Sequence, residues 1–444
     1  MFFSFSFWTW PHIVDAVLLG ITLFNLLIAA TEASWRLYAW RTPEAAEAFT
    51  WPAPIPSGSE KLGFDLILPL RDEALVIGDT LRGLLNQRHG WFHIIVSLCD
   101  DDQATADAVQ QVVREENAAD RITTVVGIYE NPSKAKQLNV ALEHCYGDVV
   151  GVIDAEDDVA EDLLAHVEAL FDQSGADVVQ GGVQLMNLGD RPAKWFQVHN
   201  VLEYFFWFTS RMAFHAKAGF VPLGGNTVFI RREMLEAAGG WPLSITEDCA
   251  LGVLLSTEHG AKVATAYSPV LATREECPPT LFNKSTGSLF WQRDRWIRGF
   301  CAELATGRWR RMPTRRRQAF AGYVLATPAL QAVSFLLLPA AILIGVLATV
   351  PVGLAILMFT PFLPIGITLL SQVIGLSEFG RQYGTRPGFW HYASIICLTP
   401  LYQIILAGAA IVAIYKFLLG DNSWYKTGRA ASHREVASSY EVAA

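Results

Sequence analysis

Hydrophobic and polar positions follow two patterns along the 444-residue chain, and the first predicts an α/β region. Between residues 60 and 155, short apolar runs alternate with stretches of helical periodicity. This alternation predicts strands at 64–69, 94–98, 122–126 and 149–153, and helices at 74–87 and 104–117. Strands joined in this way form a mostly parallel sheet with helices on its faces, so the expected fold class is α/β. Ligands bind such sheets at the carboxyl ends of the strands.

The second pattern consists of long apolar segments that predict membrane helices. The first segment, Ile13 to Thr31, is about long enough to cross a bilayer. A signal peptide is the alternative, but no lysine or arginine precedes this segment. Three more spans are expected at 321–347, 353–374 and 392–418. We therefore expect an N-terminal anchor and flank (1–50), a soluble domain (51–317), a three-span region (318–420) and a flexible tail (421–444).

Two other helical stretches mix aromatic and charged residues in a way that a spanning helix would not tolerate. They cover residues 194–220 and 288–317. The first is crowded with aromatic residues but interrupted by His199, Glu203 and Arg211. We expect both to be interfacial helices, with the aromatic side among the lipid headgroups. A helix in the protein core is the alternative for 194–220.

Composition and charge limit the partners. Hydrophobic residues make up 52% of the chain, which supports insertion into a lipid bilayer, and the net charge of −9 argues against a nucleic-acid partner. The basic run at 308–317 stands just before an apolar segment, a position typical of the cytoplasmic side. We expect a multi-pass protein of the plasma (inner) membrane whose soluble domain is cytoplasmic. The six cysteines lack paired spacing, so reduced thiols are expected.

Acidic clusters follow three of the predicted strands. They are Arg71-Asp72-Glu73, Asp100-Asp101-Asp102 and Asp154-Ala155-Glu156-Asp157. Any one of them alone could be a solvated turn or a helix cap. Together they predict a site for a divalent cation and a nucleotide, because hard cations take carboxylate oxygens and bridge them to phosphates. Lys134, at the start of a helix, could contact the same phosphates.

The stretch from Leu243 to Gly299 holds two further motifs, Thr246-Glu247-Asp248 and Gln292-Arg293-Asp294-Arg295-Trp296. Gln292, Arg295 and Trp296 fall at i, i+3 and i+4, so on a helix they share one face. A guanidinium group suits phosphate, and an indole suits the apolar face of a sugar ring. This face predicts a sugar-phosphate site, and a polar helix face with one anchoring tryptophan is the alternative.

In this order, with flanking membrane spans, these motifs resemble those of the membrane-integrated family 2 glycosyltransferases, which include cellulose, chitin and hyaluronan synthases. The resemblance covers most of the chain. The matching residues are Leu68 to Glu73, Asp100 to Asp102, Lys134 with Leu138-Asn139, Asp154 to Asp157, Thr246 to Asp248, and Gln292-x-x-Arg295-Trp296. The resemblance implies a GT-A-type nucleotide-sugar-binding domain with interfacial and transmembrane helices.

The resemblance also implies a role for each motif. The donor would be a nucleotide sugar, a UDP-hexose or UDP-N-acetylhexosamine, bound by Glu73, Asp100 or Asp101, Lys134 and Asp154. Asp154 with Glu156 or Asp157 would hold Mg²⁺ or Mn²⁺; the motif has an extra residue, so the second ligand stays open. Asp248 would be the general base. Glu247, Gln292, Arg295 and Trp296 would border the acceptor and the diphosphate.

Three functions are compatible with these features. The leading hypothesis is an inverting transferase that extends a β-linked polysaccharide or oligosaccharide and could pass it outward. The second is a non-processive transferase that glycosylates a lipid, because about four spans are few for a polysaccharide channel. The third is a membrane scaffold or pseudoenzyme, against which the complete set of acidic residues stands.

Overall fold

The computed structural model describes residues 10–40, 53–189, 192–284, 287–347, 350–421, 423 and 432–434. Much of the predicted N-terminal flank and of the predicted flexible tail, namely residues 1–9, 41–50, 422, 424–431 and 435–444, lies outside the described residues. All six cysteines are free thiols, as expected from their spacing.

A seven-stranded sheet organises the α/β region, in the order β3-β2-β1-β4-β7-β5-β8. The strands are β1 (Phe64–Pro69), β2 (Phe92–Cys99), β3 (Ile122–Gly127), β4 (Val149–Val152), β5 (Val178–Gln180), β7 (Val228–Arg231) and β8 (Val263–Thr265). β1 pairs in parallel with β2 and β4, and β7 runs antiparallel to β4 and β5. A separate two-stranded parallel sheet joins β6 (Gly182–Leu185) to β9 (Ala272–Glu275). The predicted mostly parallel α/β fold is confirmed.

Helices cover both faces of the sheet because the central strands are apolar on both faces. Ile67 and Ile95 pack on one face with Leu138 of α5 (Lys134–Leu142). Their neighbours Leu66 and Ile94 pack on the other face with α3 (Ile77–Leu85), α4 (Gln103–Glu115) and α6 (Leu163–Ser174). The uninterrupted apolar runs of the sequence therefore correspond to strands that are buried on both sides.

The aromatic stretch at 194–220 forms α7 (Phe196–Phe206), a π-helical turn (Trp207–Arg211) and α8 (Met212–Ala218). Most of α7 is buried: Phe205 and Phe206 pack in the same core as the sheet residues and as Phe379 and Ile395 of the C-terminal helices. This burial matches the core-helix alternative, and placement of the stretch at a membrane surface stays a prediction. α9 (Arg232–Ala237), α10 (Glu247–Leu254) and α11 (Leu289–Thr306) follow.

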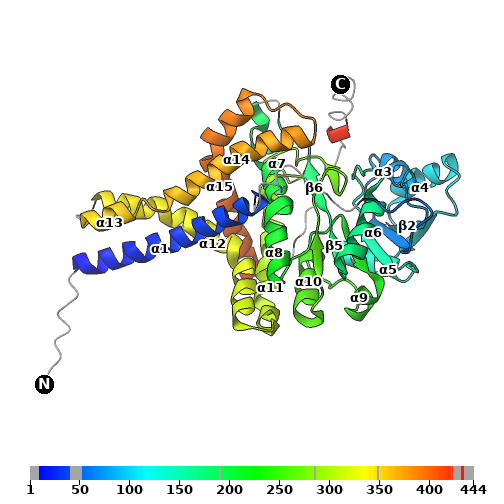
Figure 1. Cartoon of the computed structure of the whole chain (residues 1–444), viewed down its shortest axis with the longest axis horizontal. Helices are drawn as coiled ribbons and strands as arrows, with labels where there is room; N and C mark the ends of the chain where they lie inside the picture. Colours follow the sequence, from blue (N-terminus) through cyan, green and yellow to red (C-terminus); the bar gives the residue numbers. More distant parts are fainter. Residues whose placement is uncertain are drawn as a thin grey trace.

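Among the described residues, four helices are long and apolar enough to cross a membrane, as the sequence predicts. The spans are His12–Trp40, Arg315–Leu347, Val352–Gln382 and Phe389–Leu418. They contain α1 (Trp10–Leu37), α12 (Arg315–Leu347), α13 (Val352–Leu357), α14 (Phe362–Gln382) and α15 (Phe389–Leu418). Figure 1 shows α1, α12 and α13 projecting together from one side of the α/β region. α1 packs against α12 and α14 although it lies at the other end of the sequence.

Candidate active site

The loops that follow β1 and β4 leave the sheet side by side. The two strands are parallel, with Ile67 opposite Val152. Glu73 lies in the loop after β1 and Asp154 in the loop after β4, and both line a cavity of about 2000 Å³. The carboxyl edge of the sheet therefore forms one wall of this cavity.

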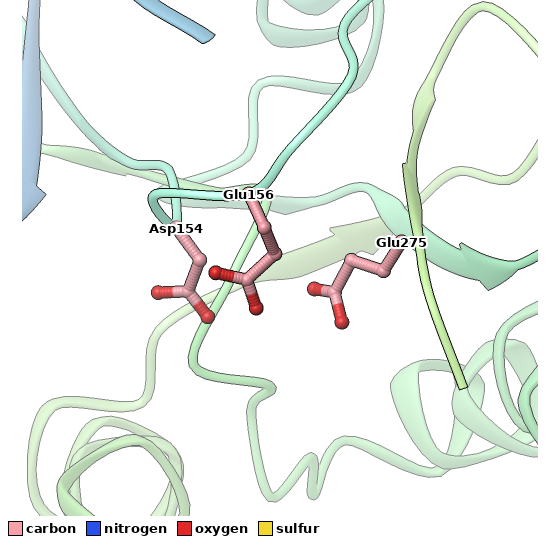
Figure 2. Close-up of side chains that lie close together, drawn as sticks. All are labelled: Asp154, Glu156 and Glu275. Atoms are coloured by element: carbon pink, nitrogen blue, oxygen red, sulfur yellow. The ribbon is translucent and has the colours of Figure 1, made fainter. Parts of the chain in front are cut away.

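Three carboxylates converge in the cavity. Oxygen atoms of Asp154, Glu156 and Glu275 all lie within 4.8 Å of one another. Figure 2 shows the side chains pointing toward one another, Asp154 and Glu156 from the loop after β4 and Glu275 from the end of β9. Carboxylate oxygens are the ligands that Mg²⁺ and Mn²⁺ prefer, so this set of donor atoms fits either ion.

Asp157, the last acid of the same motif, does not belong to this group of three carboxylates. Its side chain is hydrogen-bonded to other parts of the protein. Its carboxylate accepts hydrogen bonds from the backbone N–H of Asp154 (2.8 Å) and from the side-chain amide of Asn226 (2.8 Å). The same amide donates to Glu275 (2.7 Å). Burial raises the pKa of Asp157, and the nearby carboxylate of Glu275 raises it further. The geometry groups Glu156, rather than Asp157, with Asp154, and Asn226 ties their loop to Glu275.

Lys134, at the start of α5, lies beside these acids. Its ammonium group donates to Asp154 Oδ1 (2.5 Å) and to the backbone oxygen of Gly225 (2.8 Å). Burial alone would lower the pKa of Lys134, but Asp154, Glu247 and Asp248 outweigh this effect and raise it above its usual value. Lys134 is therefore protonated and offsets part of the negative charge.

Glu247 and Asp248 lie in the first turn of α10. Burial raises the pKa of both carboxyl groups, that of Glu247 to about 7 with a further contribution from Asp248, while Lys134 opposes the shift. A Cβ atom at Gly225 would come within 2.9 Å of Asp248 Oδ2, so the glycine turn lies directly against this carboxylate. Asp248 lies inside the helix and does not cap it, because α10 begins at Glu247 and Thr246 occupies the N-cap position.

The predicted face of α11 lines the cavity with all three of its residues, Gln292, Arg295 and Trp296. The indole of Trp296 lies 6.0 Å from the ring of Tyr204, which comes from α7 and also lines the cavity. The i, i+3, i+4 spacing therefore predicts the shared face correctly. The two rings form an aromatic wall of the kind that binds sugars.

Two residues of α11 hold it against its neighbours. Arg293 donates to Asn200 (2.7 Å) and Glu203 (2.8 Å) of α7. Gly299 lies so close to Thr246 that a Cβ atom would come within 1.9 Å of Thr246 Oγ1. The glycine therefore allows α11 to approach the acidic motif that begins α10.

The second acidic cluster does not join the others. Asp100 and Asp101 are exposed and do not line the cavity, whereas Glu73 does. Asp101 pairs with Arg71 (3.3 Å), which lines the cavity itself. Asp102 is buried and caps α4 with its carboxylate. For this cluster the helix-cap alternative describes the third aspartate, and donor binding by Asp100 or Asp101 stays a prediction.

The C-terminal segment returns to the same loop. Arg434 Nη2 donates to Thr80 Oγ1 (2.7 Å) and to the backbone oxygens of Glu156 (3.4 Å) and Asp157 (3.2 Å). Arg434 Nη1 donates to Asp79 (3.2 Å) of α3. Figure 1 shows this short helical piece in red, on the same side as α3. Arg434 therefore fastens the loop that carries Glu156 to α3.

Sequence reasoning missed three residues of this site: Glu275, Asn226 and Arg434. The acidic pair Glu275-Glu276, which begins at the last residue of β9, was a signal that could have been used. Asn226 lay in a glycine-rich turn without other acids, and Arg434 is separated from Glu156 by 278 positions. The chain alone offers no cue to such a distant contact.

The cavity continues from these acids into the space between the helices that are long and apolar enough to cross a membrane. We call the part lined by Asp154, Glu156, Glu275, Glu247 and Asp248 the acidic end. The membrane end is lined mainly by apolar residues of α1, α12, α14 and α15, which include Ile28, Ala29, Pro328, Ala332, Phe335, Leu338, Ile365, Leu369, Ile396 and Leu406. One continuous space therefore joins a charged site to an apolar passage.

Comparison with known proteins is consistent with this architecture. Residues 63–299 match the model of "Glycosyltransferase like family 2". A Beta-monoglucosyldiacylglycerol synthase of Trichormus variabilis is 26% identical over 237 residues, 53% of this chain and 48% of that protein. An N-acetylglucosaminyltransferase of Mesorhizobium japonicum is 26% identical over 254 residues, 55% of this chain and 57% of that protein. The chain thus spans about half the length of the curated relatives it matches.

Among solved structures, the mannosyltransferase PcManGT from Pyrobaculum calidifontis, in complex with GDP-Man and Mn²⁺, has a similar fold. The two share 19% identity with a TM-score of 0.59, over 92% of this chain and 99% of that one. The likeness in fold therefore extends over nearly the whole of this chain.

Proposed function

This chain belongs to glycosyltransferase family 2, and from that premise we propose that it transfers a sugar from a nucleotide donor to a membrane lipid. One observation carries the choice of acceptor: the cavity runs from the acidic end to the apolar membrane end without interruption. A lipid could place its hydroxyl group near Asp248 while its chains lie between α1, α12 and α14. The first curated relatives, named as synthases of a glucosylated diacylglycerol, point in the same direction.

The acidic end would bind the donor, for which we propose a UDP-hexose or UDP-N-acetylhexosamine. Asp154, Glu156 and Glu275 would hold Mg²⁺ or Mn²⁺, with Asp157 and Asn226 supporting their loop. Such a cation neutralises the charge that develops on the leaving diphosphate. Lys134 would contribute a second positive charge beside Asp154, and Glu73 would contact the nucleoside.

Asp248 would act as the general base. The acceptor hydroxyl would lose its proton to Asp248 as its oxygen bonds to the anomeric carbon, while the bond from that carbon to the diphosphate breaks. A single displacement of this kind inverts the anomeric centre, so an α-linked donor gives a β-linked product. Glu247, with a pKa of about 7, can keep its proton beside an ionised Asp248 at neutral pH.

The aromatic wall favours a second candidate function. Trp296 and Tyr204 could hold the terminal sugar of a glycan, with Gln292 and Arg295 at its hydroxyl groups and at the diphosphate. The product would then be a growing β-linked polysaccharide or oligosaccharide. The two candidates share the donor site and differ in what occupies the membrane end.

We further propose that the α/β region faces the cytoplasm from the plasma (inner) membrane. The basic run at 308–317, next to the start of α12, supports this orientation. Nucleotide sugars would then reach the acidic end from the cytoplasm.

Product analysis tests the choice of acceptor. Purified protein in lipid nanodiscs would be given labelled UDP-sugars, and the products separated into organic and aqueous fractions. We expect one labelled sugar per lipid in the organic fraction. A labelled polymer that grows with time would overturn lipid glycosylation and support the second candidate.

A substitution that fills the membrane end also tests whether the acceptor is a lipid. Ala29 of α1 lines that end, so Ala29→Phe should reduce lipid glycosylation about tenfold or more while leaving slow hydrolysis of the UDP-sugar unchanged. Val346→Phe, at a position that is 76% exposed on α12, is the matched control and should have little effect. Equal loss of both reactions in Ala29→Phe would contradict an acceptor at the membrane end.

A further inference from the structure

A second group of charges lines the cavity at the C-terminal end of α1. Arg36 pairs with Glu32 one turn earlier (3.0 Å), and Arg211 of the π-helical turn approaches the same carboxylate (3.8 Å). Gln331 of α12 donates a further hydrogen bond to Glu32 (3.0 Å). Glu32, Arg36, Arg211 and Gln331 all line the cavity. We call these four residues the arginine cluster.

The arginine cluster carries a surplus of positive charge. Within the described part of the chain, Glu32 is the one carboxylate that forms an ion pair with either Arg36 or Arg211. Glu203, which also lines the cavity, forms its ion pair with Arg293 (2.8 Å). Two guanidinium groups therefore share one carboxylate in a largely buried place, where an unbalanced charge is costly.

Among the described residues, Glu203 is the second carboxylate that acts on Arg211, and its charge is already shared with Arg293. Arg211 lies over the rings of Trp35 (4.1 Å) and Trp207 (5.0 Å), which contribute only weak cation–π attraction. His215 packs edge-on against Trp35, and burial lowers its pKa well below the usual value, so it is neutral. The surplus charge thus remains available to an anion in the cavity.

The position of the arginine cluster indicates where that anion comes from. Ser210 Oγ donates to the backbone oxygen of Arg36 (3.0 Å) and ties the end of α1 to the π-helical turn. The end of a spanning helix, flanked by tryptophans, is the depth at which lipid headgroups lie. The apolar membrane end of the cavity continues from this point between α1 and α12.

We propose that Arg36 and Arg211 bind the phosphate group of an anionic membrane lipid, whose chains lie in the membrane end of the cavity. Guanidinium groups bind phosphate through paired, charge-assisted hydrogen bonds. This site goes beyond the proposed transfer reaction and rests only on the placement of α1 in a membrane. It would make the enzyme selective for membranes that contain phospholipids with a net negative charge.

Lipid binding measured without any sugar donor tests this site. Purified protein in neutral detergent would be titrated with phosphatidylglycerol, with phosphatidylcholine and with inorganic phosphate, and bound lipid counted by native mass spectrometry. We expect phosphatidylglycerol to bind about tenfold or more tightly than phosphatidylcholine. Equal binding of the two lipids, or full competition by inorganic phosphate at similar concentration, would overturn the proposal.

Three variants separate lipid recognition from a purely structural role. Arg211→Gln should remove most of the preference for phosphatidylglycerol, and Arg211→Lys should retain much of it. Glu32→Gln should strengthen the preference, because it removes the carboxylate that competes with the phosphate. If the arginines serve only to fasten α1, Glu32→Gln would destabilise the protein without raising the preference, and the proposal would be wrong.

Arg316→Gln is the matched control, because Arg316 is an exposed arginine of α12 that does not line the cavity. Its lipid preference should equal that of the unmodified protein. Since none of these measurements uses catalysis, their failure would leave the proposed transferase function intact. Conversely, an inactive protein that still prefers phosphatidylglycerol would count against the function alone.

Discussion

The two ends of the cavity bury charges of opposite sign. At the acidic end, the carboxylates of Asp154, Glu156 and Glu275 lie within 4.8 Å of one another, and Lys134 offsets only part of their charge. Where the membrane end begins, Arg36 and Arg211 share the carboxylate of Glu32. A surplus of either sign in a buried site favours a ligand of the other sign. Under our two proposals, one cavity would bind a cation with a nucleotide diphosphate at one end and an anionic lipid at the other.

The two ends also differ in how the chain builds them. The acidic end is assembled from the loop after β4, the end of β9 and the start of α10, which are far apart in sequence. Much of the arginine cluster is local, because Glu32 and Arg36 stand one turn apart on α1. Substitutions of the carboxylates at the acidic end should therefore affect catalysis strongly. Substitutions of residues that only hold its loop in place should have smaller effects.

The largest effect should come from Asp248→Asn, which would establish that the chemistry belongs to the acidic end. The variant keeps the shape of the side chain but cannot accept the proton of the acceptor hydroxyl. Sugar transfer should fall about 10²–10⁴-fold, while UDP-sugar binding measured by calorimetry stays the same. Asp120→Asn, in an exposed turn, is the control. Normal turnover in Asp248→Asn would remove this residue from the mechanism.

The next effect concerns the negative charge of the acidic end. Glu275→Gln should weaken Mn²⁺ binding by the protein without substrate about 10- to 100-fold, because it removes one charged ligand. Electron paramagnetic resonance of free Mn²⁺ provides the measurement. Glu276→Gln is the matched control, since Glu276 binds Ser432 (2.6 Å) outside the three-carboxylate group. An equal loss of Mn²⁺ affinity in both variants would contradict the assignment of Glu275 as a metal ligand.

A smaller effect should follow from the buried proton of Glu247. Its pKa rises from 4.5 to about 7 on folding, so between these values the folded protein holds a proton that the unfolded chain releases. The free energy of unfolding should therefore fall as pH rises through this window, by about 2–3 kcal/mol. Thermal unfolding across the window should show this slope, and Glu247→Gln should reduce it. Glu143→Gln, at an exposed position, is the control and should leave the pH dependence of stability unchanged. If Glu143→Gln also reduced this dependence, groups other than Glu247 would be responsible for it.

The smallest effect should come from Arg434, which contacts the acidic end only through the backbone of its loop. Arg434→Ala should raise the KM for the nucleotide sugar about 3- to 10-fold and change kcat by less than about twofold. Arg434→Lys should give a KM between that of Arg434→Ala and that of the unmodified protein. Arg114→Ala, at an exposed position of α4, is the control. A change in thermal stability without any change in KM would limit Arg434 to a structural role.

Local patterns were sufficient to predict most elements. The runs at 64–69 and 122–126 predicted β1 and β3 almost to the residue, and the apolar segments predicted all four membrane-length helices of the described chain. The face formed by Gln292, Arg295 and Trp296 was also predicted, because the helical repeat alone sets it. In each case the decisive signal lay within a few neighbouring residues.

Predictions that depended on distant packing were less complete. Aromatic content alone could not separate an interfacial helix from a core helix at α7, because burial there comes from the sheet and from α14 and α15. The acids after β2 could not be divided into exposed and capping residues without the position of α4. The same side chains support either outcome until their neighbours are known.

The sequence by itself determined which segments are apolar, which side chains carry charge, and which of them share a helix face, because these properties follow from composition and helical repeat. Only the tertiary structure decided that the carboxylate of Glu156, rather than that of Asp157, joins those of Asp154 and Glu275, since the Asp157 carboxylate accepts hydrogen bonds from Asn226 and from the backbone of Asp154. It also decided that Glu275 and Arg434 arrive at the same loop. The direction of a side chain after a strand depends on hydrogen-bond partners from other parts of the chain, and the local sequence pattern does not specify these partners.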